Sequence, residues 1–320
     1  MYYIGIDLGG TNIAIGIVDQ DKNIVVKGSV PTGASRDSEA IVADMASLCL
    51  SLIAEANLTV AQIAYAGIAA PGTIDPVTRT IVYANNLPFR SFAIGKRLSE
   101  LTGIARIYIE NDANAAALGE ALAGAAKGSR YSVMITLGTG VGGGIILENK
   151  IYSGFNYAGA ELGHMVIKHG GAPCSCGRRG CFEAYCSATA LVRMTKEKME
   201  QRPDSLMWKS ANGGKVSGKT AFAAMRQGDE AATQVVEEYL DYLACGLANV
   251  INIFQPNVLC IGGGVCGEGD NLLRPLLPRI FKETYGGETK DPAGCTRVVI
   301  ATLGNDAGII GAASLGDYQE

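Results

Sequence analysis

One histidine and three cysteines are spaced closely enough along the chain to form a metal site. His164 is followed by Cys174, Cys176 and Cys181, in the pattern H-x9-C-x-C-x4-C. Three thiolates and one imidazole make a full tetrahedral set for Zn²⁺, and four protein ligands leave no open position for a reactive water. We therefore predict a structural zinc ion that fixes this loop. His169 is a competing ligand, because it lies nearer to the cysteines in the sequence.

Two glycine-rich turns, each between two apolar runs, have the composition of phosphate-binding loops. Residues 4–18 read IGIDLGGTNIAIGIV and residues 133–148 read VMITLGTGVGGGIILE. Glycines allow backbone N–H groups to converge on phosphate oxygens, while Asp7 could position Mg²⁺ and Thr11 or Asn12 could bind phosphate. The alternative is an ordinary hairpin turn, in which Gly-Gly is common. The repetition of the pattern, with a third glycine run at 262–264, favours phosphate binding.

Two literal motif matches are rejected on their context. Residues 138–143 match the dinucleotide fingerprint G-x-G-x-x-G, but that motif leads directly into a helix, whereas GIILENK predicts a strand. Residues 213–220 match the Walker A pattern, but the polar segment RPDSLMWKSAN replaces the buried strand that must precede it. We predict a surface loop there, with Thr220 as the cap of a helix at 221–226.

The elements that must position these residues alternate between strands and helices. Apolar and β-branched runs predict strands at 3–8, 13–18, 24–30, 63–69, 104–109, 131–137, 144–148, 258–261 and 298–301. Helical spacing predicts helices at 38–56, 92–101, 112–126, 184–199, 229–254 and 307–315. The two glycine segments share one strand–turn–strand architecture, which predicts two related α/β domains with a cleft between them.

Composition limits the class of protein. The chain has 320 residues, more than one hydrophobic core usually serves. Its net charge of −4 and its lack of a basic stripe argue against a nucleic-acid-binding surface. The start, MYYIGIDLGG, lacks the basic and apolar regions of a secretory signal, and no apolar run reaches the length of a membrane span. We therefore expect a cytoplasmic protein, in which clustered cysteines are better read as metal ligands than as disulfides.

These motifs carry a resemblance to known families. DLGGT and LGTGVGGG resemble the phosphate loops of the superfamily that includes sugar kinases and actin. GAELGHMVI, CSCGRRGCFEAYCSATAL and ENDANAAALGE resemble the ROK family (repressors, open reading frames and sugar kinases), over essentially the whole chain. The resemblance implies an α/β fold of two ribonuclease-H-like (actin/hexokinase-type ATPase) domains. The expected N-terminal domain covers 1–115, with a C-terminal helix at 305–320 returning to it, and the larger domain covers 116–304 and carries the zinc loop.

The resemblance also implies the site residues. ATP, with Mg²⁺, is expected at Asp7, Gly9, Gly10, Thr11, Asn12, Gly138, Thr139, Gly140, Gly142, Gly263, Gly264 and Asn305. A sugar is expected at Gly72, Asn86, Asn111, Asp112, Glu161, His164 and Glu183.

The predicted chemistry centres on Asp112, which joins a predicted strand to a predicted helix. On the residues alone, Asp112 either caps that helix or acts as a base; the resemblance implies a base that takes the proton from a sugar 6-hydroxyl as it attacks the γ-phosphate of ATP. Glu161 and Glu183 could accept hydrogen bonds from sugar hydroxyls or be solvated loop charges. His164 could bind zinc through one ring nitrogen and a sugar hydroxyl through the other.

Several functions share this residue set. The segment CSCGRRGCFEAYCSATAL looks most like a bacterial ROK glucokinase, an enzyme of glycolysis, with N-acetylmannosamine, N-acetylglucosamine, allose or fructose as alternative substrates. A sugar-sensing repressor would need a helix-turn-helix domain, for which the strand beginning at residue 2 is expected to leave no room. A sugar-binding pseudo-kinase and a polyphosphate donor are further alternatives. The family resemblance implies a dimer or tetramer.

Overall fold

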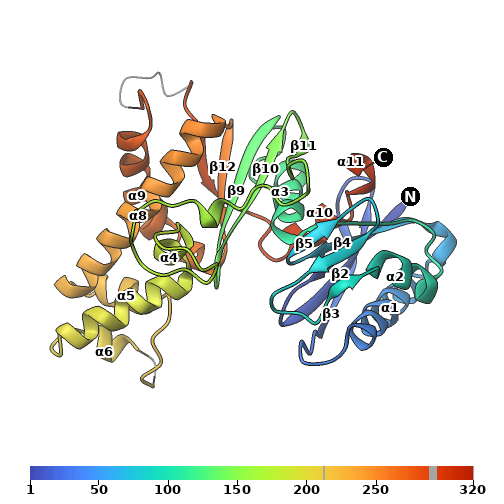
Figure 1. Ribbon diagram of the computed structural model, residues 1–320, viewed down its shortest axis with the longest axis horizontal. Helices are drawn as coiled ribbons and strands as arrows, with labels where there is room; N and C mark the ends of the chain where they lie inside the picture. The colour runs from blue at the N-terminus through green and yellow to red at the C-terminus, as the bar shows by residue number, and fades with distance from the viewer. Residues whose placement is uncertain (212, 288–293, 320) are drawn as a thin grey trace. The chain divides into compact units, whose positions relative to one another are not determined.

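The computed structural model describes residues 1–211, 213–287 and 294–319 (Figure 1). The chain forms two compact units. Unit 1 consists of residues 1–132, 144–160 and 302–320, and unit 2 of residues 133–143 and 161–301. The domain boundary predicted between residues 115 and 116 stays a prediction.

Strands and helices alternate along the chain. The strands are β1 (Tyr2–Leu8), β2 (Asn12–Asp19), β3 (Ile24–Pro31), β4 (Ile63–Ala70), β5 (Thr73–Asp75), β6 (Thr80–Tyr83), β7 (Arg90–Phe92), β8 (Ile107–Asn111), β9 (Tyr131–Leu137), β10 (Val141–Leu147), β11 (Lys150–Ile151), β12 (Val258–Gly262) and β13 (Arg297–Ile300). The α-helices are α1 (Ser38–Glu55), α2 (Ile94–Thr102), α3 (Asp112–Ala123), α4 (Glu183–Cys186), α5 (Ala188–Gln201), α6 (Met207–Ser210), α7 (Thr220–Met225), α8 (Glu230–Phe254), α9 (Asp270–Glu283), α10 (Asp306–Ala312) and α11 (Gly316–Gln319). Short 3₁₀ turns are η1 (Val60–Gln62), η2 (Leu162–His164) and η3 (Gly264–Glu268).

The first sheet has the strand order β3-β2-β1-β4-β8. Strands β1, β2 and β3 pair antiparallel as two successive hairpins, β4 pairs with β1 in parallel, and β8 pairs with β4 in parallel. Each parallel strand therefore ends at the same edge of the sheet as β1. This edge carries the first glycine turn and the start of α3, so the DLGGT and ENDAN segments lie at the same edge, at the ends of strands that are separated by β4.

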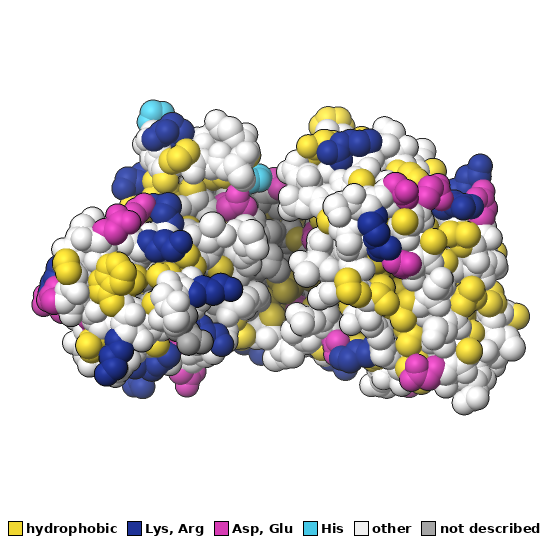
Figure 2. Space-filling model, turned by 90° about the horizontal axis from the view of Figure 1, so that it is seen from below, with side chains coloured by type: hydrophobic (Ala, Val, Ile, Leu, Met, Phe, Trp, Pro, Cys, Tyr) yellow, Lys and Arg dark blue, Asp and Glu magenta, His cyan; other side chains and the backbone are white. Residues whose placement is uncertain are grey.

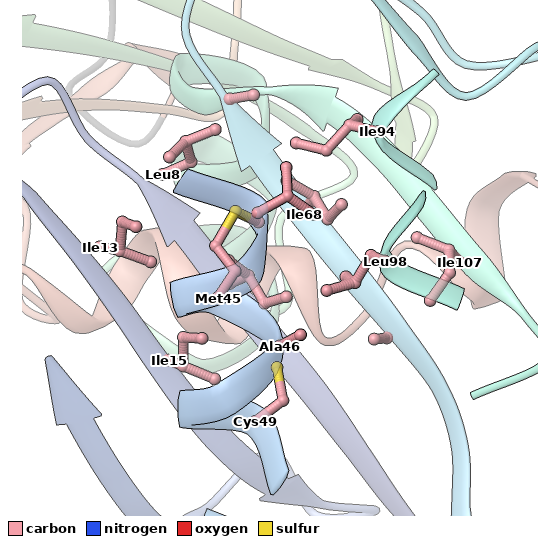
Figure 3. Packing of buried hydrophobic residues seen from close by; sticks show 14 of the residues in the cluster. Leu8, Ile13, Ile15, Met45, Ala46, Cys49, Ile68, Ile94, Leu98 and Ile107 are labelled. Carbon is pink, nitrogen blue, oxygen red and sulfur yellow. The ribbon is translucent and has the colours of Figure 1, made fainter. Parts of the chain in front are cut away.

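One face of this sheet is covered by α1 and α2. Figure 3 shows Met45, Ala46 and Cys49 of α1 pointing toward Ile15 and Ile68 of the sheet. These side chains belong to a single cluster of buried apolar residues, and burial of each large one stabilises the unit by roughly 1.5–3 kcal/mol. This core fixes the strands from which the site residues project.

The other face is covered by α3 and α10, which pack against each other and against the strands. Glycines allow α10 to lie unusually close. A Cβ at Gly5 would be 1.9 Å from the carbonyl oxygen of Ile309, and one at Gly67 would be 1.8 Å from that of Ala312. Any side chain at these two paired strand positions would push the helix away from the sheet.

The second sheet has the order β11-β10-β9-β12-β13. Counted by first appearance, both sheets run third, second, first, fourth, fifth, with the last two strands parallel in each. The predicted repeat of an α/β fold is therefore confirmed at the level of strand order. In unit 2, the long helix α8 packs against α5, α7 and α9.

Some elements differ from the predictions. The helix predicted at 184–199 is broken at Ser187, which has extended backbone (ψ 159°) and whose side chain accepts the N–H of Ala190 to cap α5. The strands β5, β6 and β7 form a small sheet that was not predicted, since each has only three or four residues. Helix α9 was also not predicted; it contains Pro275 and Pro278, which usually end a helix.

The remaining predictions concern the surface. Among the residues that the structure describes before position 213, the short helix α6 and not a strand leads toward the Walker-like segment, and Thr220 begins α7 rather than capping it. Figure 2 shows Lys and Arg side chains in separate groups among acidic and uncharged residues on the face seen there. Among the described residues, no helix is long and apolar enough to span a membrane.

Candidate active site

The first glycine turn is a tight hairpin that is stabilised by two hydrogen bonds from Thr32. Leu8 pairs with Ile13 across the turn, and the N–H of Gly9 donates to the carbonyl of Asn12 at 3.0 Å. The buried hydroxyl of Thr32 donates to the carbonyl of Gly9 at 2.6 Å, and its N–H donates to that of Thr11 at 2.9 Å. Gly10, Thr11 and Asn12 are exposed at the tip. The turn is thus fixed in shape and open to a ligand.

Asp7 lies at the base of this turn. Burial raises the pKa of its carboxyl from 3.8 to about 6, and the charge of Asp112 adds to the shift. Gly308 of α10 packs directly against it, since a Cβ at Gly308 would lie 2.8 Å from Cγ of Asp7. The Asp112 carboxyl is therefore close enough to Asp7 in unit 1 to raise the pKa of Asp7. A pair of this kind is suited to bind a cation.

Asp112 is the first residue of α3 but does not cap it. The cap is Asn111, whose Oδ1 accepts the N–H groups of Ala113 at 2.9 Å and Asn114 at 3.3 Å. The alternative that Asp112 serves merely as the helix cap is therefore wrong. Asp112 also accepts the Ala113 N–H at 2.8 Å, and burial raises the pKa of its carboxyl above the usual range. A carboxylate with a raised pKa is better suited to take a proton at neutral pH.

Asn111 connects three parts of unit 1. Its Nδ2 donates to the carbonyl of Gly72 at 3.3 Å, and its N–H donates to the buried carboxyl of Glu110 at 2.8 Å. Gly72 has a φ of +97°, and a Cβ there would lie 2.1 Å from the Tyr83 carbonyl, so this turn requires glycine. Asn86 is exposed in the segment between β6 and β7. Of the predicted sugar residues in unit 1, the structure brings Gly72, Asn111 and Asp112 together.

The second glycine turn, in unit 2, is held differently. The N–H of Gly138 donates to the carbonyl of Gly140 at 3.0 Å. The N–H of Val141 donates to Oε2 of Glu183 at 3.1 Å, and a Cβ at Gly140 would lie 2.3 Å from that same oxygen. Gly163 of η2 packs on Val141, because a Cβ there would be 2.0 Å from its carbonyl oxygen. The acidic and histidine-bearing segments therefore lie directly against this turn.

The other residues expected at ATP occupy three places. Gly142 is within β10, and Gly264 begins η3. Gly263 follows β12 with a φ of +95°, and a Cβ there would lie 2.4 Å from the Leu137 carbonyl, so it adjoins the end of β9. Asn305 precedes α10 and belongs to unit 1.

The predicted metal ligands come together in unit 2. One ligand atom from each of His164, Cys174, Cys176 and Cys181 lies within 4.8 Å of all the others. The Cys176 and Cys181 sulfurs are 3.7 Å apart, and Nδ1 of His164 is 3.6 Å from the Cys174 sulfur. A tetrahedral zinc with bonds of about 2.3 Å places its sulfur ligands about 3.8 Å apart, so the cluster fits this ion. His169 is exposed and lies outside the cluster, which removes it as the competing ligand.

The two glutamates of unit 2 differ in their surroundings. Glu161 is exposed immediately before η2, and its carbonyl accepts the N–H of His164 at 3.0 Å. Glu183 is the first residue of α4, and its Oε1 accepts the hydroxyl of Ser175 at 3.0 Å. Ser175 stands between Cys174 and Cys176, so the cysteine loop and Glu183 are directly linked. Glu183 is therefore not a freely solvated loop charge.

Sequence reasoning missed two residues that hold the site. Glu110 is 6% exposed and also accepts Nδ2 of Asn114 at 3.1 Å, thereby fixing the start of α3. The available signal was a carboxylate in an otherwise apolar strand, which must have internal partners. Ser175 carried no such signal, because its role depends on the folded loop.

Comparisons with known proteins find similarity over nearly the whole length of the chain. A model of the ROK family matches residues 3–318. A glucokinase of Thermotoga maritima is 36% identical over 98% of this chain and 96% of its own length. The crystal structure of a ROK family glucokinase from Streptomyces griseus, in complex with glucose and AMPPNP, has a TM-score of 0.81 and 34% identity, and covers 98% of this chain and 99% of that one. The xylose repressor of Bacillus subtilis is 27% identical over 98% of this chain and 76% of its own length.

Proposed function

We propose that this chain, which belongs to the ROK family, is an ATP-dependent hexokinase that phosphorylates glucose at the 6-hydroxyl. Support comes from the near-full-length similarity to a glucokinase and to a structure that holds glucose and an ATP analogue. The same similarity supports the two-unit α/β fold of the sugar kinases.

The environment of Asp112 carries the proposal. Because Asn111 caps α3, the Asp112 carboxylate is left to accept a proton, and burial raises its pKa toward the value a general base needs. We assign Asp112 as the base that takes the proton of the sugar 6-hydroxyl while the hydroxyl oxygen attacks the γ-phosphorus. The bond from that phosphorus to the bridging oxygen of ADP breaks, and ADP leaves.

The remaining roles follow from chemistry. Asp7, a carboxylate at the base of a glycine turn, would hold Mg²⁺ or its waters, since Mg²⁺ prefers oxygen ligands. The tips of both glycine turns would bind phosphate oxygens through N–H groups. Asn111, Glu161, His164 and Glu183 would bind the sugar hydroxyls. Bound Mg²⁺ supplies charge neutralisation on the phosphates.

The cysteine–histidine cluster is proposed to hold a structural zinc ion. All four ligand positions come from the protein, so no site remains on the metal for substrate. The role of the ion is to order the segment from His164 to Glu183, which includes two of the proposed sugar ligands.

The proposal is tested with an ATP-consumption assay across glucose, N-acetylmannosamine, N-acetylglucosamine, allose and fructose, with the product identified by NMR. We expect glucose 6-phosphate as the main product, and ATP in preference to polyphosphate as donor. Consumption of ATP with N-acetylmannosamine but not glucose would reassign the substrate. Sugar binding without any phosphorylated product would contradict the proposed activity.

Location and assembly stay predictions. A cytoplasmic location is supported by the proposed metal site, because thiolate ligands need reducing conditions. A homodimer or homotetramer is the expected assembly, which light scattering of the purified protein would test.

A further inference from the structure

Three hydrogen bonds tie the second glycine turn to the short segment that follows the last cysteine ligand. The carbonyl of Gly138 accepts the N–H of Ala188 at 2.8 Å. The carbonyl of Thr139 accepts the hydroxyl of Thr189, also at 2.8 Å, and Glu183 accepts the N–H of Val141. Residues 183–189 thus hydrogen-bond to the glycine turn at positions 138, 139 and 141, and we call them the latch segment.

The direction of these bonds decides what the turn presents. In a trans peptide, the carbonyl of one residue and the N–H of the next point in opposite directions. Because the Gly138 and Thr139 carbonyls point toward the latch segment, the N–H groups of Thr139 and Gly140 must point away from it. Two successive N–H groups aimed the same way form the kind of concave site that binds phosphate oxygens.

We propose that Thr189 is a positioning residue for nucleotide, which acts by holding the Thr139 carbonyl so that the Gly140 N–H faces the phosphate. This inference rests on the proposed function, because it takes the second glycine turn as a phosphate site. Of the three bonds, only that of Thr189 is made by an exposed side chain, so it can be removed without opening the core. The Ala188 bond is made by backbone, and Glu183 is already assigned to the sugar.

The latch segment also connects nucleotide to the metal loop. Glu183 accepts Ser175 through Oε1 and Val141 through Oε2, so a single carboxylate bridges the cysteine loop and the glycine turn. The close approach requires the glycine at position 140, where any Cβ would strike Oε2. An ordered cysteine loop therefore helps to fix the turn through Glu183. Thr189 bonds to Thr139, which lies two residues before Val141, the residue that bonds to Glu183.

The test removes the Thr189 hydroxyl and measures nucleotide and sugar separately. Thr189→Val keeps the shape of the side chain, and Thr189→Ser keeps the hydroxyl. The matched control is Thr233→Val, which removes a similar 2.8 Å hydroxyl-to-carbonyl bond on α8. We expect Thr189→Val to raise KM for ATP and Kd for ADP by about five- to tenfold, the worth of one hydrogen bond. KM for glucose should be unchanged, and Thr189→Ser and Thr233→Val should match wild type in nucleotide affinity.

The outcomes separate this inference from the proposed function. An unchanged ADP Kd in Thr189→Val, an equal rise in both KM values, or an equal loss in Thr189→Ser would overturn the role of Thr189. Wild-type protein that binds ADP but phosphorylates no sugar would overturn the proposed function, and the ADP titration would still decide the role of Thr189. Wild-type protein that binds no nucleotide would overturn both.

Discussion

The two glycine turns share a sequence pattern and a place in their sheets, yet they are supported in opposite ways. The first is held by Thr32, which directly follows strand β3 of the same sheet, and has the half-buried carboxyl of Asp7 at its base. The second is held by residues 183–189, which lie outside its sheet and follow the histidine–cysteine cluster. We infer from this difference that the proposed charge and proton chemistry depends on the first turn, whereas the second turn depends on the cysteine loop through Glu183.

The largest expected effect is on kcat when Asp112, which belongs to the same unit as the first turn, is replaced. Replacing Asp112 with Asn removes the proposed base while keeping the shape of the side chain. We expect kcat to fall roughly 10²- to 10⁴-fold, with glucose affinity within a few-fold of wild type. Glu230→Gln, at the exposed first position of α8, is the control for replacing a helix-start acid. Near-normal turnover in Asp112→Asn would contradict the assignment of the base.

The second-largest expected effect comes from removing a ligand of the proposed metal site, whose loop is linked to the second turn through Glu183. Cys176→Ser removes one metal ligand, and we expect the zinc content to fall well below one per chain. Loss of a structural metal should lower the free energy of unfolding by about 4 kcal/mol or more. Cys245→Ser, on α8 and outside the cluster, should retain zinc. Equal zinc content in both variants would rule out the proposed metal site.

A third prediction concerns the raised pKa of the Asp7 carboxyl. Its folded pKa of about 6 lies above its ordinary 3.8, so the folded state binds the proton more tightly and loses stability as pH rises through this window. In metal-free buffer, Asp7→Asn should therefore stabilise the protein by up to about 3 kcal/mol at pH 8 and by little at pH 4. Denaturant unfolding at both pH values checks this. Asp21→Asn, in the exposed β2–β3 turn, is the control, and a loss of stability at pH 8 in Asp7→Asn would contradict the prediction.

The smallest effect concerns the helix cap that leaves Asp112 available. Asn111→Ala should cost about 1 kcal/mol of stability. Asp37→Ala removes a comparable cap from α1, where Oδ1 accepts the Ala40 N–H at 2.7 Å, and should cost a similar amount. Only Asn111→Ala should also lower kcat, because Asn111 joins Asp112 to Gly72. Equal kcat in the two variants would show that Asn111 is only a cap.

Much of the site could be predicted from sequence because its signals are local. A hairpin turn between two apolar runs, and cysteines two and five residues apart, need few distant contacts to be recognised. The repeated strand–turn–strand pattern predicted two related halves, and the matching strand orders of the two sheets agree with that prediction. These features depend on residues that are close together in the sequence, so they can be recognised without a structure.

The rest depended on contacts between distant segments. Asn111 and Asp112 are both good cap residues, and only the folded backbone shows which one takes the role. The hydroxyl of Thr189 reaches a carbonyl fifty residues away in the chain. The break at Ser187 could not be predicted, since residues 184–199 continue a helical pattern and only the bond to Ala190 shows a new helix start.

The most direct test of the account is the pH dependence of kcat/KM for glucose in wild type and in Asp112→Asn. Because the base must be ionised, and burial raises the pKa of Asp112, wild-type kcat/KM should fall about tenfold per pH unit on the acid side of that pKa. Circular dichroism at each pH would verify that the protein stays folded. The account predicts that this acid limb is absent from the residual rate of Asp112→Asn. The same limb in both proteins would assign the titration, and the proton transfer, to another group.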